Sequence, residues 1–393
     1  MTRTIIHLDL DAFFCAVEAQ RDPSLHGKPF AVGGSPESRG VVASCSYPAR
    51  KYGVHSAMPM ARALQLCPQL IVVPGRHGVY GEMSRKVLAH LYNLSDLVEK
   101  VSIDEAFVDV SDLRPAPIQI ARELQSAISD DLALPCSLGA ATNKLVAKIA
   151  NTIGKASAGT DSPPMAVKVI PPGHEADFLA PLDVTELWGV GPKTAASLAR
   201  LGIETIGDLA AWPKEDLIRR FGKHGRALAR RAQGIDDRPV QTDHEVKSIS
   251  RETTFAHDVT EAMTLHRTLC RLSEDVGRRL RNAGLAGSTV KVKLRWSDFT
   301  TLTRQVTLDQ PTRQDDVIRR EAEALFEAAW TRGKPVRLIG VGVSNLSEPH
   351  RQLSLWETRD EKGRHLQQAL DEVRDRFGSD AIRHAFELDG DDG

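Results

Sequence analysis

The chain has 393 residues, more than one hydrophobic core usually organises, so we expect several domains. Hydrophobic residues make up 41% and charged residues 26%, which excludes a largely disordered or fibrous chain. The formal net charge of −1 excludes a generally basic protein, so any surface that binds nucleic acid has to be local. No apolar run reaches the roughly 20 residues that span a bilayer, and the cysteines lack CxxC spacing. We therefore expect a cytoplasmic chain with no membrane partner and with cysteines that act as small buried side chains.

The N-terminal part of the chain interleaves predicted strands and helices. Residues 4–10 (TIIHLDL) form an apolar run that predicts a buried strand, and helical spacing follows over 12–20. The later elements are predicted as strands at 29–34 and 40–46, helices at 57–66 and 79–91, two strands within 99–110, a helix at 118–130, a strand at 136–141 and a helix at 143–152. This alternation indicates a sheet-based domain.

The C-terminal part is predicted to contain a compact helical region and a second sheet domain. Turns at Gly189, Gly202 and Gly222 divide the helical spacing of residues 184–234. Residues 236–250 show little apolar periodicity and predict a linker. The elements after it are predicted as a helix at 265–282, strands at 289–296 and 301–308, a helix at 316–329, a strand at 336–343 and a tail helix at 363–377.

Three carboxylates follow or interrupt these apolar segments. Asp9 ends the first predicted strand, and Asp104 and Glu105 lie in the turn between two later strands. Carboxylates held together at strand ends repel one another unless cations lie between them. Two Mg²⁺ ions suit such an oxygen site and can activate a 3′-hydroxyl and stabilise a leaving pyrophosphate. The alternative for either motif alone is a solvated acidic turn.

The segments around these carboxylates resemble two motifs of the Y-family DNA polymerases, DNA polymerase IV class. HLDLDAFFCAVE is similar to the first palm motif of the family, and VSIDEAFVDVS is similar to the second. The similarity continues in order from about Ile5 to Leu346. By this resemblance Asp9, Asp104 and Glu105 are the catalytic residues. The ligands of two Mg²⁺ ions, or of Mn²⁺ in their place, would be Asp9, the carbonyl of Leu10, Asp104 and Glu105.

Aromatic and basic side chains are predicted to hold the incoming dNTP. By the resemblance Phe14 is a steric gate under the sugar that excludes a 2′-hydroxyl, and Phe13 also belongs to the nucleotide site. The alternative for Phe14 is an ordinary core residue of its helix. In SYPARKYGV, the phenol of Tyr47 and the guanidinium of Arg50 suit a triphosphate. Such a run is also typical of a solvated turn, but the family places its triphosphate-binding Tyr and Arg here.

A lysine-bearing segment follows in TNKLVAKIANTIGKASAG. The resemblance assigns phosphate binding to Lys155. The usual Lys-Pro-x-Gly of the family is replaced here by KASAG and a longer loop, so this match departs from the family pattern. Lys144 and Lys148 can equally be a solvated helix face.

Two sets of residues are predicted to bind DNA phosphates. In LWGVGPKTAASLARLGIETIGDLA, Gly189 and Gly191 permit a hairpin between helices, and the amides at the next helix N-terminus, with Lys193, suit a phosphate. The alternative is a helical turn with glycine caps. The second set shares one face of the strand at 289–296 and consists of Lys291, Lys293 and Arg295. The alternative there is an ordinary charged strand, and the resemblance favours contact with the DNA duplex.

A short motif in the polar tail is predicted to bind a partner. Its glutamine and large apolar residues resemble the clamp-binding peptide of bacterial polymerases. The residues concerned are Gln352, Leu353, Leu355 and Trp356. The predicted partner is the sliding clamp, and the alternative is a tail strand that packs on its own domain.

With the order of the predicted elements, the resemblance implies an α+β multidomain right-hand polymerase with a ferredoxin-like palm, small fingers, a helical helix-hairpin-helix thumb and a βαββαβ-type little finger. The predicted boundaries are 1–28 and 76–165 for the palm, 29–75 for the fingers, 166–238 for the thumb, 239–247 for a linker, 248–346 for the little finger and 347–393 for the tail. The resemblance implies a monomeric, template-directed enzyme that extends primer-template DNA, tolerates damaged templates with low fidelity and lacks a proofreading exonuclease.

Two alternatives from other classes remain. A nucleotide cyclase can use paired carboxylates on a related palm, but the hairpin motif and the clamp-like peptide argue against it. A DNA-binding relative without activity is the other alternative. The crowding of Asp9, Asp104 and Glu105 argues against it, because an inactive protein has no need for those charges.

Overall fold

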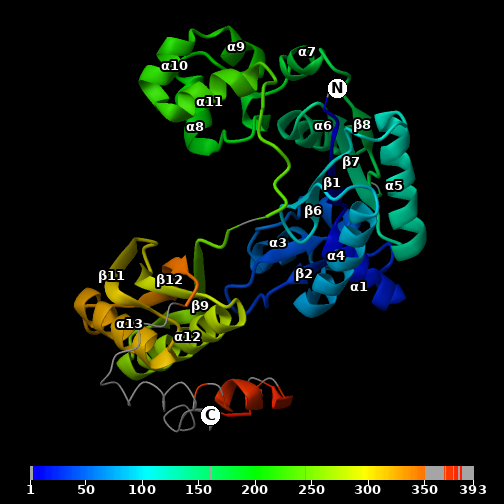
Figure 1. The fold of residues 1–393 in the computed structure, drawn as a ribbon. Helices are drawn as coiled ribbons and strands as arrows, with labels where there is room; N and C mark the ends of the chain where they lie inside the picture. Colours follow the sequence, from blue (N-terminus) through cyan, green and yellow to red (C-terminus); the bar gives the residue numbers. More distant parts are fainter. Residues whose placement is uncertain are drawn as a thin grey trace. The chain divides into compact units, whose positions relative to one another are not determined.

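The computed structural model describes residues 3–159, 162–243 and 245–349, and also residues 367, 369–374, 376–378 and 381–382. The chain divides into two compact units, of which the first ends at residue 244 and the second begins at residue 245 (Figure 1). No helix of the described part is long and apolar enough to cross a membrane. Outside the described ranges lie the predicted clamp-binding residues Gln352, Leu353, Leu355 and Trp356.

The first unit is built around a five-stranded sheet. Across the sheet, the strands are β5 (Val98–Lys100), β6 (Glu105–Asp109), β1 (Ile5–Leu10), β7 (Cys136–Ala141) and β8 (Val167–Val169). β1 is antiparallel to both of its neighbours, and β8 is parallel to β7. The helices of this layer are α1 (Phe13–Arg21), α4 (His77–Tyr92), α5 (Pro117–Leu132) and α6 (Lys144–Ser157). The order β1, helix, β5, β6, α5, β7 is the predicted ferredoxin-like connectivity.

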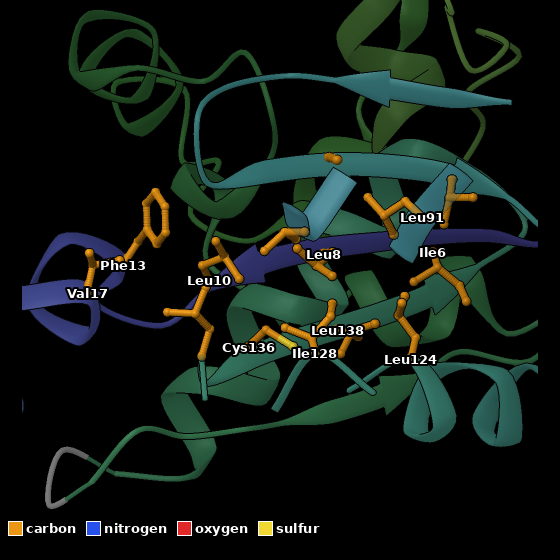
Figure 2. Packing of buried hydrophobic residues seen from close by; sticks show 14 of the residues in the cluster. Ile6, Leu8, Leu10, Phe13, Val17, Leu91, Leu124, Ile128, Cys136 and Leu138 are labelled. Atoms are coloured by element: carbon orange, nitrogen blue, oxygen red, sulfur yellow. The ribbon is translucent and has the colours of Figure 1, made fainter. Parts of the chain in front are cut away.

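The two faces of β1 are covered by different helices, because side chains alternate along a strand. Leu8 and Leu10 point into a core formed with α1, α4 and α5, which Figure 2 shows. Further labelled members of this core are Ile6, Phe13, Val17, Leu91, Leu124, Ile128, Cys136 and Leu138. Ile5 belongs to a second core that includes residues of α6. His7 and Asp9 therefore lie on the α6 face of the sheet.

A three-stranded sheet is inserted between α1 and α4. Its strands are, in order, β3 (Val42–Cys45), β2 (Phe30–Gly33) and β4 (Ile71–Pro74). The short helices of this segment are η1 (Pro23–Leu25), α2 (Tyr47–Arg50) and α3 (Met60–Leu66). β4 was not predicted from the sequence, because Val73 is its one buried residue. The five cysteines of the chain are free and buried, as predicted.

A helical region follows β8. Its elements are α7 (Glu175–Leu179), η2 (Val184–Glu186), α8 (Pro192–Ala199), α9 (Ile206–Ala211), α10 (Lys214–Phe221) and α11 (Lys223–Ala232). The predicted turns at Gly189, Gly202 and Gly222 have φ of 102°, 75° and 60°, which favours glycine. A capping box between Thr205 and Asp208 begins α9. The helical prediction for residues 184–234 is confirmed.

The second unit has the order βαββαβ. Its elements are β9 (Ser248–Val259), α12 (Ala262–Asn282), β10 (Ala286–Trp296), β11 (Thr301–Thr312), α13 (Asp315–Ala329) and β12 (Val336–Ser347). The sheet order is β11-β10-β12-β9, and all neighbouring pairs are antiparallel. The predicted βαββαβ order includes a first strand, but the apolar spacing gave it no bounds, and the linker predicted at 236–250 overlaps the first residues of β9. β9 is an edge strand in which only Ile249 is buried, so it lacks the apolar alternation of a strand with one covered face.

Candidate active site

The three predicted catalytic residues lie at the same end of the β1–β6 pair. Asp9 is the direct cross-strand partner of Glu105, so their side chains lie on the same face of the sheet. Asp104 precedes Glu105, and its carbonyl accepts a hydrogen bond of 3.0 Å from the amide of Leu10. Its side chain accepts a hydrogen bond from Ser102. The fold thus makes neighbours of all four predicted metal ligands, although they come from segments almost 100 residues apart.

Lys155 of α6 is bound between two carboxylates. Its Nζ lies 2.6 Å from Oδ1 of Asp9 and 2.8 Å from Oδ1 of Asp11. The buried Asp11 also accepts hydrogen bonds from Ser137 Oγ at 2.8 Å and from the Met165 amide at 3.1 Å. Burial would lower the pKa of Lys155, but the two carboxylates outweigh burial and raise it. Burial also raises the pKa of Asp9, although the ammonium of Lys155 opposes this shift.

Glu105 is held through one of its two oxygens. His7 Nε2 lies 2.6 Å from Glu105 Oε1, and the ammonium of Lys148 donates to the same oxygen. The Asn151 side-chain amide donates to His7 Nδ1 at 3.0 Å and to the Ser137 carbonyl at 2.9 Å, which leaves the imidazole proton on Nε2. Burial lowers the pKa of His7, so the ring is neutral. Burial would raise the pKa of Glu105, but His7 and Lys148 outweigh it and lower the pKa to about 2.

Lys144 and Lys148 do not form the solvated helix face that the sequence left open. Lys144 is 3% exposed, and its Nζ lies 2.7 Å from Oε2 of the buried Glu99. The same oxygen accepts a hydrogen bond of 2.8 Å from the Gln241 amide. The solvated alternative is therefore wrong, because α6 turns these lysines toward carboxylates of the sheet.

Apart from Lys155 on α6, the predicted nucleotide-binding residues lie on α1 and α2. Phe13 is buried in the core, whereas Phe14 is half-buried and stacks on Tyr80 with ring centroids 4.1 Å apart. The guanidinium carbon of Arg50 lies 4.6 Å from the centre of the Tyr47 ring. Burial raises the pKa of Tyr47, and the carboxylate of Asp11 adds to this shift, so the phenol stays protonated and can donate. The electrostatic effect of Asp11 on Tyr47 also connects α2 with the carboxylate site.

The predicted hairpin lies between η2 and α8. Gly191 is the N-cap of α8, and Lys193 is exposed in the first turn of this helix. Arg231 of α11 donates a hydrogen bond of 2.9 Å to the carbonyl of Trp188. A Cβ on Gly189 would lie 2.7 Å from that guanidinium, so the left-handed turn and this close approach both favour glycine.

The three basic residues of β10 share the less buried face of their strand, as predicted. Their neighbours Val290, Val292 and Leu294 are buried on the opposite face. Lys293 reaches across β12 to Glu252 of β9, at 2.8 Å, and Arg295 lies 2.9 Å from Thr301 of the neighbouring strand β11. The members of this basic set are Lys291, Lys293 and Arg295.

The donor atoms of the carboxylate site fit a divalent cation. Asp9, Asp104 and Glu105 offer oxygen ligands only, as Mg²⁺ and Mn²⁺ prefer. Within the described ranges no three His, Cys, Asp or Glu side chains converge closely enough to hold a metal ion. Instead, the ammonium groups of Lys155 and Lys148 neutralise Asp9 and Glu105. The site therefore calls for positive charge, and its oxygens suit a hard cation.

Family models match three segments of the chain. The impB/mucB/samB family matches residues 8–152, its C-terminal domain matches residues 246–355, and the IMS family HHH motif matches residues 172–203. DNA polymerase IV of Dehalococcoides mccartyi (strain CBDB1) is 40% identical over 387 residues, which cover 97% of this chain and 96% of that relative. DNA polymerase IV of Listeria monocytogenes serotype 4b (strain F2365) is 40% identical over 348 residues, covering 88% of this chain and 96% of that relative. The chain belongs to the Y-family DNA polymerases, DNA polymerase IV class.

Solved structures of Y-family polymerases share this fold. A Y-family DNA polymerase chimera of Dbh and Dpo4 has a TM-score of 0.76 and 27% identity, covering 87% of this chain and 98% of that chain. DinB from Sulfolobus solfataricus has a TM-score of 0.59 and 28% identity, covering 88% of this chain and 100% of that chain. The predicted right-hand polymerase fold is confirmed. The chain is a DNA-directed DNA polymerase of the translesion type, and its family implies dependence on a divalent metal ion.

Several residues of this polymerase site were not singled out from the sequence. They are His7, Asp11, Asn151 and Trp188. The alternation of β1 places His7 on the same face as Asp9, and positions 144, 148, 151 and 155 follow the period of one helix stripe. The strand alternation and the helix spacing are both visible in the sequence, but neither shows that this face of α6 packs against β1.

Proposed function

We propose that this polymerase joins dNMP units to a primer 3′-hydroxyl by two-metal phosphoryl transfer and releases pyrophosphate. The observation that carries the proposal is the cross-strand pairing of Asp9 with Glu105, next to Asp104. The groups that would hold two Mg²⁺ ions, or Mn²⁺, are Asp9, the carbonyl of Leu10, Asp104 and Glu105. When bound, such ions supply activation of the 3′-hydroxyl and charge stabilisation of the leaving pyrophosphate.

The side chains around the carboxylates would position the dNTP. Lys155 is held by Asp9 and Asp11, and its ammonium would transfer to phosphate oxygens once the carboxylates are neutralised by other cations. Arg50 and Tyr47 offer a guanidinium and a protonated phenol to the same triphosphate. Phe14 is the proposed steric gate, because its stacking on Tyr80 fixes the ring. Phe13 supports the gate from the core, with ring centroids 5.5 Å apart.

The DNA would be held through its backbone. The amides at the N-terminus of α8, with Gly189, Gly191 and Lys193, suit a phosphate of the duplex. The basic face of β10 suits a phosphate track, and it consists of Lys291, Lys293 and Arg295. Contacts of this kind carry no base sequence, as a polymerase that copies any template requires.

The finer biological role rests on family membership. We expect low-fidelity synthesis past damaged bases in DNA damage tolerance, no proofreading exonuclease, a monomeric and cytoplasmic enzyme, and recruitment by the sliding clamp. The proposed clamp-binding residues are Gln352, Leu353, Leu355 and Trp356. The proposed domains are the palm at 1–28 and 76–165, fingers at 29–75, thumb at 166–238, linker at 239–247, little finger at 248–346 and tail at 347–393.

The deciding experiment is primer extension on a gapped template with Mg²⁺ and dNTPs. Asp104→Ala should lower the extension rate by about 1,000-fold while DNA binding remains. The matched control is Asp130→Ala, which removes an exposed aspartate of α5 and should extend like the wild type. Chelation of divalent ions should abolish extension by all variants. DNA binding without extension by the wild type would instead support the inactive relative.

A further inference from the structure

Trp188 lies directly before the hairpin of the thumb and also contacts the palm. Its ring is stacked against Phe107 of β6, with centroids 6.3 Å apart. The ammonium of Lys148 lies 5.4 Å from the centre of the same ring, within the range of a cation–π interaction. Phe107 is two residues beyond Glu105 on the same strand, so Trp188 approaches the carboxylate site from the thumb.

Two arginines fix Trp188 on the thumb side. Arg231 donates to the Trp188 carbonyl at 2.9 Å. The guanidinium carbon of Arg238 lies 4.2 Å from the centre of the indole ring. Arg238 is itself oriented by Asp236, which accepts hydrogen bonds of 2.7 and 2.8 Å from it. The indole is therefore held in place both by its backbone and by its ring.

Lys148 lies between the indole and Glu105. Its ammonium and His7 both donate to Oε1 of Glu105. Among the described residues, Oε2 of Glu105 accepts no hydrogen bond in the structure, so the second oxygen is available to a cation. A carboxylate held by one oxygen in this way presents the other oxygen in a defined direction.

We propose that Trp188 is a positioning residue for the metal site, which holds the Lys148 ammonium on Glu105 and so connects the DNA-binding hairpin to the carboxylates. The inference rests on the proposed function, since it takes Glu105 to be a metal ligand. Because Trp188 is adjacent to Gly189, a phosphate bound at the hairpin and a cation bound at Glu105 favour the same placement of the indole. Such coupling is reciprocal, so DNA should tighten metal binding and metal should tighten DNA binding.

The test compares Trp188→Leu with Trp188→Phe, which keeps an aromatic face for Lys148. The first readout is the equilibrium binding of Mn²⁺, which electron paramagnetic resonance measures in the presence of primer-template DNA and in the absence of dNTP. The second is the Mg²⁺ concentration that half-saturates insertion of one nucleotide. From the usual strength of a cation–π contact, we expect Trp188→Leu to weaken Mn²⁺ binding about threefold to tenfold and to raise the half-saturating Mg²⁺ concentration by a similar factor. Trp188→Phe should keep most of the Mn²⁺ affinity and a half-saturating Mg²⁺ concentration close to that of the wild type.

Two further variants separate positioning from general damage to the thumb. Trp212→Leu removes another half-buried tryptophan that packs on the same core, and it should leave Mn²⁺ binding unchanged. In a Lys148→Met background, Trp188→Leu should not weaken Mn²⁺ binding further, because the ammonium group that the indole holds is absent. Circular dichroism and DNA binding confirm that each variant is folded.

The proposal is overturned if Trp188→Leu changes Mn²⁺ binding by the same factor with and without Lys148. It is also overturned if Trp188→Leu behaves like Trp212→Leu, or if Trp188→Phe is as defective as Trp188→Leu. A wild type without Asp104-dependent extension would contradict the proposed function itself. Asp104-dependent extension with an unaltered Trp188→Leu variant would contradict the positioning role alone.

Discussion

Gly139 of β7 lets the palm sheet and α6 pack in close contact, which makes Gly139→Ala a direct test of how the site is built. A Cβ on Gly139 would lie 2.1 Å from the Ala147 carbonyl oxygen and 2.5 Å from the Asn151 amide nitrogen. Both atoms belong to the backbone of α6, so no change of rotamer relieves the contact. Restoring an ordinary contact of 3.4 Å requires α6 to move by roughly 1 Å. That helix carries Lys148 and Lys155.

We expect Gly139→Ala to lower both the stability of the protein and the rate of primer extension. Overpacking a core usually costs about 1–3 kcal/mol, and two contacts with helix backbone place this variant at about 3 kcal/mol of unfolding free energy. A displacement of roughly 1 Å at a catalytic site can lower the rate about 100-fold. We therefore expect primer extension by Gly139→Ala to fall about 100-fold, even at a temperature at which the variant is folded.

Urea unfolding followed by circular dichroism gives the stability, and primer extension gives the rate. The matched control is Gly81→Ala in α4, because a Cβ at Gly81 has no atom within 4 Å. Alanine in the middle of a helix should stabilise the protein by up to about 1 kcal/mol. The two glycine substitutions should thus change the unfolding free energy in opposite directions. A Gly139→Ala variant with the stability and rate of the wild type would refute this account of the packing.

Three further variants test other parts of the structure. Lys144→Met should lower the unfolding free energy by about 3–5 kcal/mol, because it leaves the buried carboxylate of Glu99 unpaired; the double variant with Glu99→Leu should recover most of the loss in thermal unfolding. Burial would raise the pKa of Asp236, but hydrogen bonds from Arg238 outweigh it and lower the pKa below 3.8, so this stabilisation is present above pH 3.8 and is lost as the pH falls further. The urea midpoint of Asp236→Asn should accordingly be lower than that of the wild type at pH 6 and approach it at pH 3. A difference between the two midpoints that does not change with pH would contradict the assignment. Phe14→Val should raise ribonucleotide insertion relative to deoxyribonucleotide insertion by about 10- to 200-fold in single-nucleotide kinetics, and an unchanged ratio would exclude a steric gate at this position.

The sequence predicted those elements whose residues have a clear buried face. CSLGAA was predicted as a strand at 136–141, and β7 has the same bounds because all six residues are buried. The bounds of β9 could not be read from apolar spacing, because an edge strand with one buried residue leaves no apolar pattern. The boundary of a predicted element is therefore most secure where burial is complete.

The site could be predicted only in part for a different reason. The acidic motifs are local in sequence, so Asp9, Asp104 and Glu105 could be named from spacing and resemblance. The contacts of Lys148 with Glu105 and Trp188 depend on where α6 and the thumb pack, which no local pattern specifies. A helix stripe of lysines looks the same whether it faces water or carboxylates.

The first and last strands of the second unit are paired. Ser248 of β9 is the partner of Ser344 of β12, and Ile249 is the partner of Val343. The polypeptide therefore enters and leaves this sheet at neighbouring points along one ladder. Recombination on either side of residues 248–347 would therefore replace the whole sheet without cutting any of its hydrogen-bonded strand pairs. Exchange of residues 248–347 as one segment would likewise leave the strand pairs of the first unit intact.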